Sequence, residues 1–471
     1  MSTLTDKKIM FDLRTTFPRR VSIIGAARSG IAAAGYFRSK GVSLFVSDSC
    51  AADKLEKILY ESGLKEIPHE SGNHTEQVLE SDLIVLSPGV PSDLAVLGEA
   101  RKRDIPVWSE MELGFRASDA TFLAVTGSTG KSTTVSFLGE ALKAGNRESV
   151  VAGNIGIPVI SVVAGMSKSG WVAAEVSSFQ LENIEQFRPK GAAVLNLMKN
   201  HLDRYQSEDD YYAAKKQIAR NFTKDNYLVV NLHDGRLVEW ARAMRHRTNV
   251  IFFGHEPGTG DAYWYDGKSG TIRYRFQGSH GTICSVGDMR ITGRHNFENA
   301  CAAAALAKLA GIDDASIGNG ITRFSGLPHR LEFAGEVRGV RYYNDSKSTT
   351  AESITAAISA FTTGRVYLIA GGRDKGCDFN AVKDALRAYV GGVCLIGEAA
   401  GRMEAEWQGI VPLYRCSSLE EAVTVAVQKA GSGDAVVLSP GCSSFDMFAD
   451  YKERGERFKK IVAALAAGGV Q

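Results

Sequence analysis

One stretch of eight residues, 126–133, places the strongest constraint on how this chain can fold. It reads TGSTGKST, follows the apolar run 122–125 and precedes a segment with helical character. A short buried strand, a glycine turn and a helix start form a cradle for anions, because the first N–H groups of a helix lack partners and the helix dipole favours negative charge. The Lys131 side chain can reach phosphate oxygens, and the Ser132 hydroxyl can bind Mg²⁺. The stretch therefore predicts a phosphate-binding loop in an α/β domain.

The spacing of this loop departs from the usual G-x-x-x-x-G-K-[ST] pattern. Val125 stands where the first glycine is expected, and the first glycine present is Gly127. An ordinary glycine turn before a helix is the alternative interpretation. We favour phosphate binding because the strand, the Gly-Lys-Ser sequence and the helix occur in the required order.

The length and charge of the chain limit its class. A chain of 471 residues is too long for one hydrophobic core and suggests about three domains. Its 44% hydrophobic and 23% charged residues are typical of a globular protein. The 55 Lys and Arg nearly balance the 53 Asp and Glu, so no net field attracts nucleic acid or anionic lipid. We predict that neither nucleic acid nor a membrane is a partner.

The spacing of the cysteines and the hydropathy of the chain predict its cellular compartment. The 7 cysteines are scattered and never spaced C-x-x-C, which argues against a disulfide framework or a structural zinc site. The first residues contain no apolar signal segment, and no window approaches the ~18 apolar residues of a membrane-spanning helix. We expect a soluble, cytoplasmic protein that acts as a monomer.

The N-terminal region has the pattern of a nucleotide-binding βαβ unit. A strand at 21–24 leads into the glycine turn 25–30 and a helical segment, and a second strand at 42–46 precedes Asp48. A Rossmann unit places its ribose-binding acid at about this point. Ala27, however, replaces the glycine that lets the backbone approach a pyrophosphate, which argues against a dinucleotide.

A third strand at 83–86 runs into the turn 87–91. Ligands of such sheets usually bind at the carboxyl ends of the strands, where this turn is expected to lie. The alternative is that this turn and Asp48 belong to ordinary loops that bind no ligand. A short linker after 105–107 places the first domain boundary near residue 109.

The central region alternates predicted strands and helices. A buried-strand pattern at 171–176 carries Glu175 at its end, and another at 192–197 leads to the loop 200–203. An acid at the carboxyl end of a strand beside a phosphate loop is where a nucleotide-bound Mg²⁺ finds a second ligand. From 262 to 292 short alternating runs broken by glycines predict antiparallel hairpins.

Beyond a hinge at 326–328 the pattern predicts a third α/β unit, with strands at 341–343, 366–370, 393–396 and 435–438. The predicted fold is therefore α/β with three domains. Residues 1–109 form a Rossmann-like domain, residues 110–327 a central phosphate-loop domain with a mostly parallel sheet plus antiparallel hairpins, and residues 328–471 a second Rossmann-like domain.

Nine motifs occur along the chain in a fixed order: TGSTGKST (126–133), AGNIG (152–156), EVSSFQLE (175–182), NHLDRY (200–205), YYAAKK (211–216), GRHNFENA (293–300), GLPHR (326–330), NDSKST (344–349) and SPGCSSFD (439–446). Together they resemble the Mur ligases of peptidoglycan synthesis. The last three, with GGRDKG (371–376), are most similar to the branch of the family that adds D-glutamate. The resemblance covers about 21–458.

This resemblance implies an ATP-dependent ligase whose substrates are UDP-N-acetylmuramoyl-L-alanine, D-glutamate and ATP. ATP phosphorylates the carboxylate, because carboxylate oxygen is too poor a leaving group for an amine to displace. The amine then adds to form a tetrahedral intermediate that collapses to amide and phosphate. The family match also implies two Mg²⁺ ions.

The resemblance assigns catalytic roles to Lys131, His201, Lys215 and Lys347. It assigns metal binding to Ser132, Glu175, His201 and a carbamylated Lys215. Without the family match, Lys215 would be interpreted as a surface lysine and His201 as a hydrogen-bonded loop histidine.

The remaining roles follow from the same resemblance. The implied nucleotide-binding residues are Gly127, Gly130, Lys131, Ser132, Thr133, Asn296, Asn299, Arg330 and Asp345. The implied substrate-binding residues are Arg28, Ser29, Asp48, Ser87 and Gly89 at the uridine end, Asn154 near the substrate carboxylate, His329 beside the phosphates, and Thr349, Lys375, Ser444 and Tyr451 around D-glutamate.

Three alternatives remain open. A sibling ligase would add another amino acid through the same mechanism. A phosphate-loop switch or motor would hydrolyse ATP without an amine acceptor, but no effector segment or heptad run is found. A dinucleotide-dependent oxidoreductase would need the glycine that Ala27 replaces.

Overall fold

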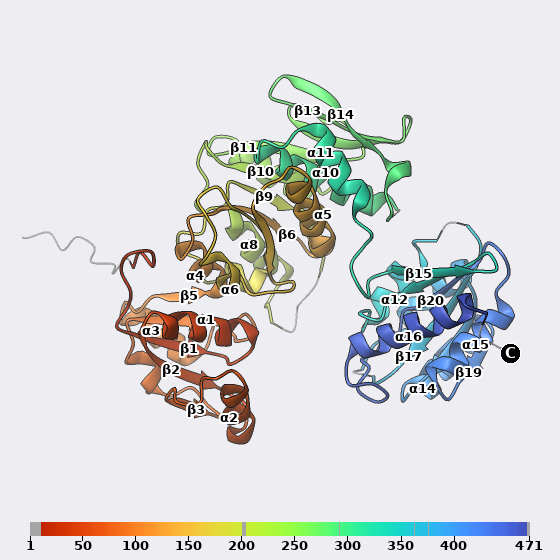
Figure 1. Cartoon of the computed structure of the whole chain (residues 1–471), viewed down its shortest axis with the longest axis horizontal. Coiled ribbons are helices and arrows are strands. Elements are labelled where there is room, and N and C mark those ends of the chain that lie inside the picture. The colour runs from red at the N-terminus through yellow and green to blue at the C-terminus, as the bar shows by residue number, and fades with distance from the viewer. Residues whose placement is uncertain (1–10, 200–203, 292, 362, 375, 469–471) are drawn as a thin grey trace, which may run out of the picture. The chain divides into compact units, whose positions relative to one another are not determined.

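The computed structural model describes the chain except for residues 1–10, 200–203, 292, 362, 375 and 469–471. The chain divides into two compact units, Met1–Phe324 and Ser325–Gln471. The first unit contains two β-sheets and the second contains one (Figure 1). None of the described helices is long and apolar enough to cross a membrane.

The first sheet has five parallel strands in the order β3-β2-β1-β4-β5. Its strands are β1 (Arg20–Ile24), β2 (Ser43–Asp48), β3 (His69–Ser71), β4 (Leu83–Leu86) and β5 (Val107–Ser109). Its helices are α1 (Arg28–Ser39), α2 (Ala52–Glu61), η1 (Glu76–Leu79), α3 (Ala95–Lys102) and α4 (Glu110–Arg116). The strand order reverses at β1, which lies between β2 and β4, so the turn after β1 lies at a topological switch point.

The second sheet has nine strands in the order β14-β13-β12-β11-β10-β9-β6-β8-β7. They are β6 (Thr121–Thr126), β7 (Ser149–Gly153), β8 (Trp171–Glu175), β9 (Gly191–Val194), β10 (Tyr227–Asn231), β11 (Asn249–Gly254), β12 (Ala262–Asp266), β13 (Thr271–Phe276) and β14 (Ser279–Ser285). The helices are α5 (Lys131–Ala144), α6 (Ile160–Val163), α7 (Ser178–Leu181), α8 (Glu208–Lys216), η2 (Gln217–Ala219), α9 (Gly235–Met244), η3 (Val286–Asp288), α10 (Arg294–Leu309) and α11 (Asp314–Arg323). Pairing is parallel from β7 to β12 and antiparallel between β12, β13 and β14, which confirms the predicted hairpins.

Helix α10 is buried on nearly all sides. Its sequence is rich in alanine, and residues 299–307 are buried without interruption. It packs against α5, α11 and strands β9 to β13 of the second sheet, and Figure 1 shows α5, α10 and α11 side by side. Small side chains allow a helix to be enclosed in this way, since they bring its backbone close to its neighbours.

The sheet of the second unit has the order β15-β16-β20-β17-β18-β19, in which only the β15–β16 pair is antiparallel. Its strands are β15 (Glu332–Val337), β16 (Val340–Asn344), β17 (Val366–Gly371), β18 (Val390–Ile396), β19 (Leu413–Arg415) and β20 (Ala435–Leu438). Its helices are α12 (Ala351–Ile358), η4 (Phe379–Val382), α13 (Lys383–Tyr389), α14 (Ala400–Trp407), α15 (Leu419–Lys429) and α16 (Tyr451–Ala466). Apolar side chains cover both faces, so this unit has its own core.

The three sheets confirm the predicted α/β class with a mostly parallel central sheet and antiparallel hairpins. The strand predicted at 83–86 is found as predicted, whereas β9 ends at Val194, three residues before its predicted end. The boundaries proposed near residues 109 and 327 stay predictions.

Glu110 joins helix α4 to helix α6 in the first unit. Its side chain is fully buried, and one carboxyl oxygen accepts the N–H of Ile160 at 2.7 Å. The other oxygen has no hydrogen-bond partner among the described residues. Burial raises the pKa of Glu110 to about 7, although the N–H groups of Ile160 and Val159 oppose this shift.

The close approach of α5 and α11 depends on Gly320. A β-carbon at Gly320 would lie 2.5 Å from the Cα of Ala141. Because the obstacle is backbone, the Gly320→Ala variant is expected to lose about 1–3 kcal/mol of unfolding free energy in urea titrations. In the matched control Gly98→Ala, on α3, the new methyl group meets nothing within 4 Å, so stability should stay level or rise by up to ~1 kcal/mol. Equal stability of both variants would contradict this packing argument.

Candidate active site

The phosphate loop connects strand β6 to helix α5, as predicted. Gly127 and Gly130 have φ angles of 148° and 81°, which favour glycine. A β-carbon at Gly130 would lie 2.6 Å from the side-chain oxygen of Asn299 on α10. The loop therefore needs glycine both for its turn and for the close contact with α10. Ser132 and Thr133 follow in the first turn of α5.

Two lysines meet at the phosphate loop. The Nζ atoms of Lys131 and Lys215 each donate to the carbonyl oxygen of Gly127 at 2.9 Å, and Lys131 also donates to the carbonyl of Ser128 at 3.1 Å. Lys215 reaches this position from helix α8 and is only 2% exposed. The structure therefore brings together two lysines that the sequence places 84 positions apart (215 − 131).

Lys215 is held in an environment that disfavours its charged form. Burial, together with the positive charge of Lys131, lowers its pKa from 10.5 to about 6, although the Glu175 carboxylate opposes this change. At pH 7 and above Lys215 is therefore mainly a neutral amine. A neutral amine is nucleophilic, whereas an ammonium ion is not.

Glu175 ends strand β8 and is buried beside the loop. One of its oxygens accepts the side-chain amide of Asn154 at 2.7 Å, while the other is buried without a hydrogen-bond partner among the described residues. The buried hydroxyl of Thr126 likewise lacks a partner there. Burying a carboxylate oxygen without a hydrogen bond costs free energy, unless a cation or a hydrogen-bond donor binds to it. Glu175 and Ser132 thus fit the oxygen ligands that Mg²⁺ prefers.

The predicted adenine-binding residues lie at the beginning of helix α10. Asn299 is 8% exposed and contacts the phosphate loop at Gly130, as described above. Asn296 lies in the first turn, where its N–H donates to the Gly293 carbonyl. The fold therefore places this helix start next to the phosphate loop, and adenine binding by Asn296 and Asn299 stays a prediction.

A cluster that the sequence analysis did not predict lies at the same helix start. The imidazoles of His233 and His255 stack with centroids 3.4 Å apart and planes 15° apart, and His255 Nδ1 lies 2.9 Å from a Glu298 oxygen. His255 Nε2 contacts Arg294. Lone pairs of parallel rings do not converge, and both His255 nitrogens already have partners. We interpret the cluster as a hydrogen-bonded brace for α10 rather than a metal site.

The predicted uridine-end residues gather at the switch point of the first sheet. Asp48 accepts the N–H groups of Ala26 (2.6 Å) and Cys50 (2.8 Å), which lower its pKa although partial burial opposes this. The Ser87 hydroxyl donates to the Gly25 carbonyl at 2.7 Å. Asp48 thus holds the glycine turn, and its predicted contact with uridine stays a prediction.

The other predicted residues of this region lie close by in sequence. Arg28 and Ser29 begin helix α1, and Arg28 donates to the Gly156 carbonyl at 3.0 Å. Gly156 belongs to the AGNIG segment that carries Asn154. The N-terminal and central parts of the first unit are therefore joined at the predicted substrate residues.

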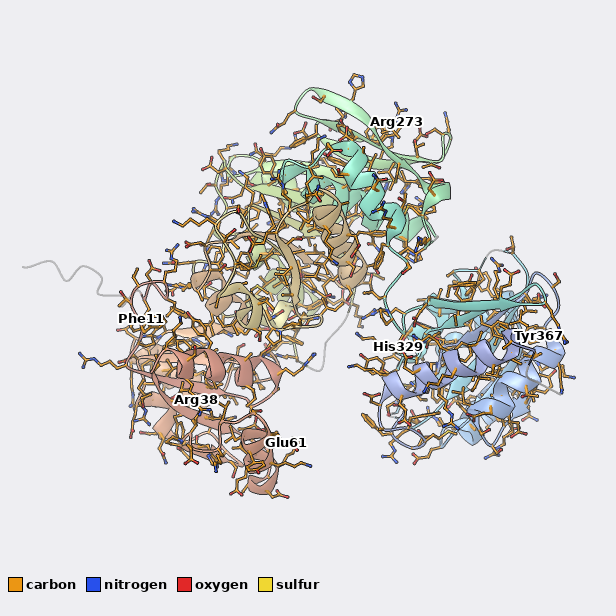
Figure 2. The ribbon with its side chains drawn as sticks, viewed as in Figure 1. Phe11, Arg38, Glu61, Arg273, His329 and Tyr367 are labelled. Carbon is orange, nitrogen blue, oxygen red and sulfur yellow. The ribbon has the colours of Figure 1, made fainter. Side chains whose placement is uncertain are left out.

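In the second unit His329, Asp345, Lys347 and Tyr451 form one group. The His329 and Tyr451 rings meet edge to face at 5.7 Å, and Lys347 Nζ lies 5.7 Å from the Tyr451 ring. Burial raises the pKa of Asp345 to about 6, although hydrogen bonds from Ser348 and Ser439 oppose this. His329, labelled in Figure 2, has φ of 63°, which is rare for a residue other than glycine and occurs often at functional sites.

Arg454 is a buried cation of the second unit that the sequence analysis missed. It is 1% exposed and donates to the Ser346 carbonyl (2.9 Å) and the Cys442 carbonyl (3.0 Å). Among the described residues it makes no ion pair. Arg454 joins the segment of Thr349 to the segment of Ser444, which brings two predicted acceptor-binding segments together. Arg330, the residue after His329, is exposed, and His201 and Lys375 lie outside the described residues.

Three family models match successive parts of the chain. They are the Mur ligase MurD-like N-terminal domain at residues 19–109, the Mur ligase middle domain at residues 125–307 and the Mur ligase glutamate ligase domain at residues 329–442. All three matched models describe domains of ligases, and they follow one another along the chain in the order of the three predicted domains. The chain belongs to the Mur ligase family, and the resemblance found in its motifs is confirmed.

Curated relatives match nearly the whole chain. It is 40% identical over 451 residues to the UDP-N-acetylmuramoylalanine--D-glutamate ligase of Geotalea daltonii, covering 96% of this chain and 98% of the relative. It is 38% identical over 458 residues to the enzyme of the same name from Koribacter versatilis, covering 95% and 98%.

Solved structures share the fold at low identity. The MurF ligase of Thermotoga maritima matches with a TM-score of 0.58 at 16% identity, covering 98% of this chain and 100% of that one. The UDP-N-acetylmuramate-alanine ligase MurC of the same organism matches with a TM-score of 0.57 at 17% identity, covering 95% and 100%. These matches confirm the three-domain α/β fold.

The buried Lys215 should reduce stability at neutral pH. Its pKa in the folded chain, about 6, lies below the ordinary lysine value of 10.5, so unfolding becomes more costly as the pH rises between these values. The Lys215→Met variant should therefore gain about 1–3 kcal/mol of unfolding free energy at pH 7 and show a smaller rise with pH. Lys216→Met, on the partly exposed neighbour, is the control. A loss of stability in Lys215→Met across this pH range would contradict the argument.

Proposed function

We propose that the chain is an ATP-dependent amide ligase that adds D-glutamate to UDP-N-acetylmuramoyl-L-alanine. The observation that carries the proposal is the group formed by the partly buried Lys131 and the buried Lys215 and Glu175 around the phosphate loop. The near full-length similarity to D-glutamate ligases supports the choice of acceptor. The reaction forms part of the cytoplasmic synthesis of peptidoglycan precursors, and we propose that the enzyme acts as a monomer.

The phosphate-loop residues suit the first chemical step. The substrate carboxylate attacks the γ-phosphorus of ATP, giving an acyl phosphate and ADP. N–H groups at the start of α5 and the Lys131 side chain would bind the triphosphate oxygens, whose charge redistributes as the bond to ADP breaks. One Mg²⁺ held through Ser132 and Glu175, and a second held in part by His201, would neutralise phosphate charge and align the reacting groups.

The second step joins the amine to the acyl phosphate. The nitrogen of D-glutamate attacks the acyl carbon, and the tetrahedral intermediate expels inorganic phosphate to leave the amide. We propose that Thr349, Lys375, Ser444 and Tyr451 hold D-glutamate, and that Lys347 stabilises the developing negative charge. Asn296, Asn299, Arg330 and Asp345 are proposed to bind the nucleotide, with His329 beside the phosphates. The domain boundaries remain as proposed, at 109 and 327.

We further propose that Lys215 reacts with CO₂ to form a carbamate. A neutral amine is required for this reaction, and the lowered pKa of Lys215 supplies one near pH 7. The amine nitrogen bonds to the carbon of CO₂ and loses a proton, which converts the neutral buried amine into an anion. That anion would complement Lys131 and supply oxygen ligands to a second Mg²⁺.

Phosphate release from ATP and Mg²⁺ tests the proposed reaction. Release should require both UDP-N-acetylmuramoyl-L-alanine and D-glutamate, and mass spectrometry should detect the new amide. L-glutamate, meso-diaminopimelate, L-lysine and no acceptor are the controls. Release without any acceptor would favour a switch or motor, and release with another amino acid would favour a sibling ligase.

The Lys215→Ala variant tests the carbamate. Activity should fall by at least 100-fold, because the variant has no nitrogen to carry the anion, and a short carboxylic acid such as acetate should restore part of it. In the wild type, ¹³C-labelled bicarbonate should give a carbamate carbon signal that Lys215→Ala lacks, while Lys216→Ala keeps it. Full activity of Lys215→Ala, or an unchanged carbamate signal, would remove this role.

A further inference from the structure

Arg204 connects the central part of the first unit to the turn 87–91 of its N-terminal part. Its Nη1 donates to the Pro88 carbonyl at 3.1 Å, and its Nη2 donates to the Val90 carbonyl at 2.8 Å. The first of these contacts joins residues 116 positions apart. Both carbonyls belong to the turn that follows strand β4. One planar guanidinium therefore fixes two points of this turn, which a single ammonium cannot do with the same geometry.

Glu182 holds the guanidinium in place. Arg204 Nη2 lies 3.4 Å from a Glu182 oxygen, and the two side chains are 16% and 17% exposed. The same carboxylate accepts the hydroxyls of Tyr205 and Ser92. Phe179 packs against the guanidinium, whose central carbon lies 4.2 Å from the ring centroid. A partly buried ion pair with these added bonds restricts Arg204 far more than a surface pair would.

The Pro88 carbonyl that Arg204 binds determines the direction in which the Gly89 N–H points. No described peptide bond is cis, so the Gly89 N–H points opposite to the Pro88 carbonyl that Arg204 binds. Among the described residues this N–H has no hydrogen-bond partner, and Gly89 is exposed with open space where a side chain would be. The Ser87 hydroxyl anchors the preceding residue to Gly25. The turn thus offers a preset donor at the switch point, where an anionic ligand can accept it.

The other side of Arg204 leads to the phosphate loop. Its neighbour Tyr205 has its ring 5.3 Å from the ring of Tyr211. The Tyr211 hydroxyl lies 3.3 Å from the Ser128 hydroxyl, and Lys215 Nζ lies 4.5 Å from the Tyr211 ring centroid. A continuous series of contacts therefore runs from the turn 87–91 to Lys131 and Lys215 at the phosphate loop.

We propose that Arg204 is a positioning residue for the nucleotide-sugar. It orients the turn 87–90 so that the Gly89 N–H meets the anionic diphosphate end of that substrate, and it couples occupancy of the turn to nucleotide binding at the phosphate loop. The identity of the ligand rests on the proposed function. In this role Arg204 acts through the turn that its guanidinium holds and through its neighbour Tyr205.

Calorimetric titration of the full chain with UDP-N-acetylmuramoyl-L-alanine tests this role without turnover. Arg204→Met should weaken binding at least tenfold, and Arg204→Lys should fall between this variant and the wild type. Arg103→Met is the matched control, because Arg103 is an exposed arginine of the same compact unit that pairs with Glu99; it should bind as the wild type does. Affinity for a non-hydrolysable ATP analogue alone should stay within twofold in every variant.

The coupling between nucleotide-sugar binding and ATP-analogue binding is a second measurement. A role of Arg204 in folding alone would not change it. In the wild type the nucleotide-sugar should alter the affinity for the ATP analogue, and in Arg204→Met this factor should approach one. Nucleotide-sugar binding within twofold of the wild type, or an equal loss of ATP-analogue affinity, overturns the role of Arg204. A wild type that does not bind the nucleotide-sugar overturns the proposed function itself, so the two failures are distinguishable.

Discussion

The carbonyl oxygen of Gly127 is the point on which the candidate site depends. Because Lys131 and Lys215 both donate to it, the phosphate loop, helix α5 and helix α8 are fixed to one another. Two basic groups this close cannot both keep their protons easily in a buried place, so burial and repulsion together make Lys215 neutral. The Glu175 carboxylate oxygen that has no hydrogen-bond partner among the described residues then adds the negative charge that a cation needs. The site combines a strong anion cradle with an unsatisfied acid, as phosphate transfer through Mg²⁺ requires.

Most of the fold could be predicted from the sequence, and several of the strands that were missed share a physical reason. Strands β3, β7, β15 and β19 lie at sheet edges, where one neighbour is absent and many side chains stay partly exposed. Edge strands therefore lack the continuous apolar runs that identify β4 and β20. Strands β10 and β11 are interior and apolar, but short apolar runs do not distinguish a strand from a buried helix segment.

The sequence predicts those site residues whose positions depend only on local secondary structure. Lys131 and Ser132 begin a helix after a glycine turn, and Glu175 ends a strand, so pattern alone locates them. Lys215 needed the family resemblance, since nothing in its own segment shows that it is buried. The contact of Arg204 with Pro88 and the burial of Arg454 depend on how distant segments pack, and no local pattern records that. These residues become visible only when the tertiary structure is known.

The buried Glu110 has a consequence when it is considered together with Lys215. Its pKa is raised from 4.5 to about 7, so unfolding releases a proton from this carboxyl group between those values, and stability falls as the pH rises through them. Lys215 has the opposite effect above about 6, because its unfolding takes a proton up. Near neutral pH the two proton exchanges therefore oppose each other. The contributions of these two groups to the stability curve therefore meet in a shallow minimum near neutral pH, where a small change in pH alters the folded population least.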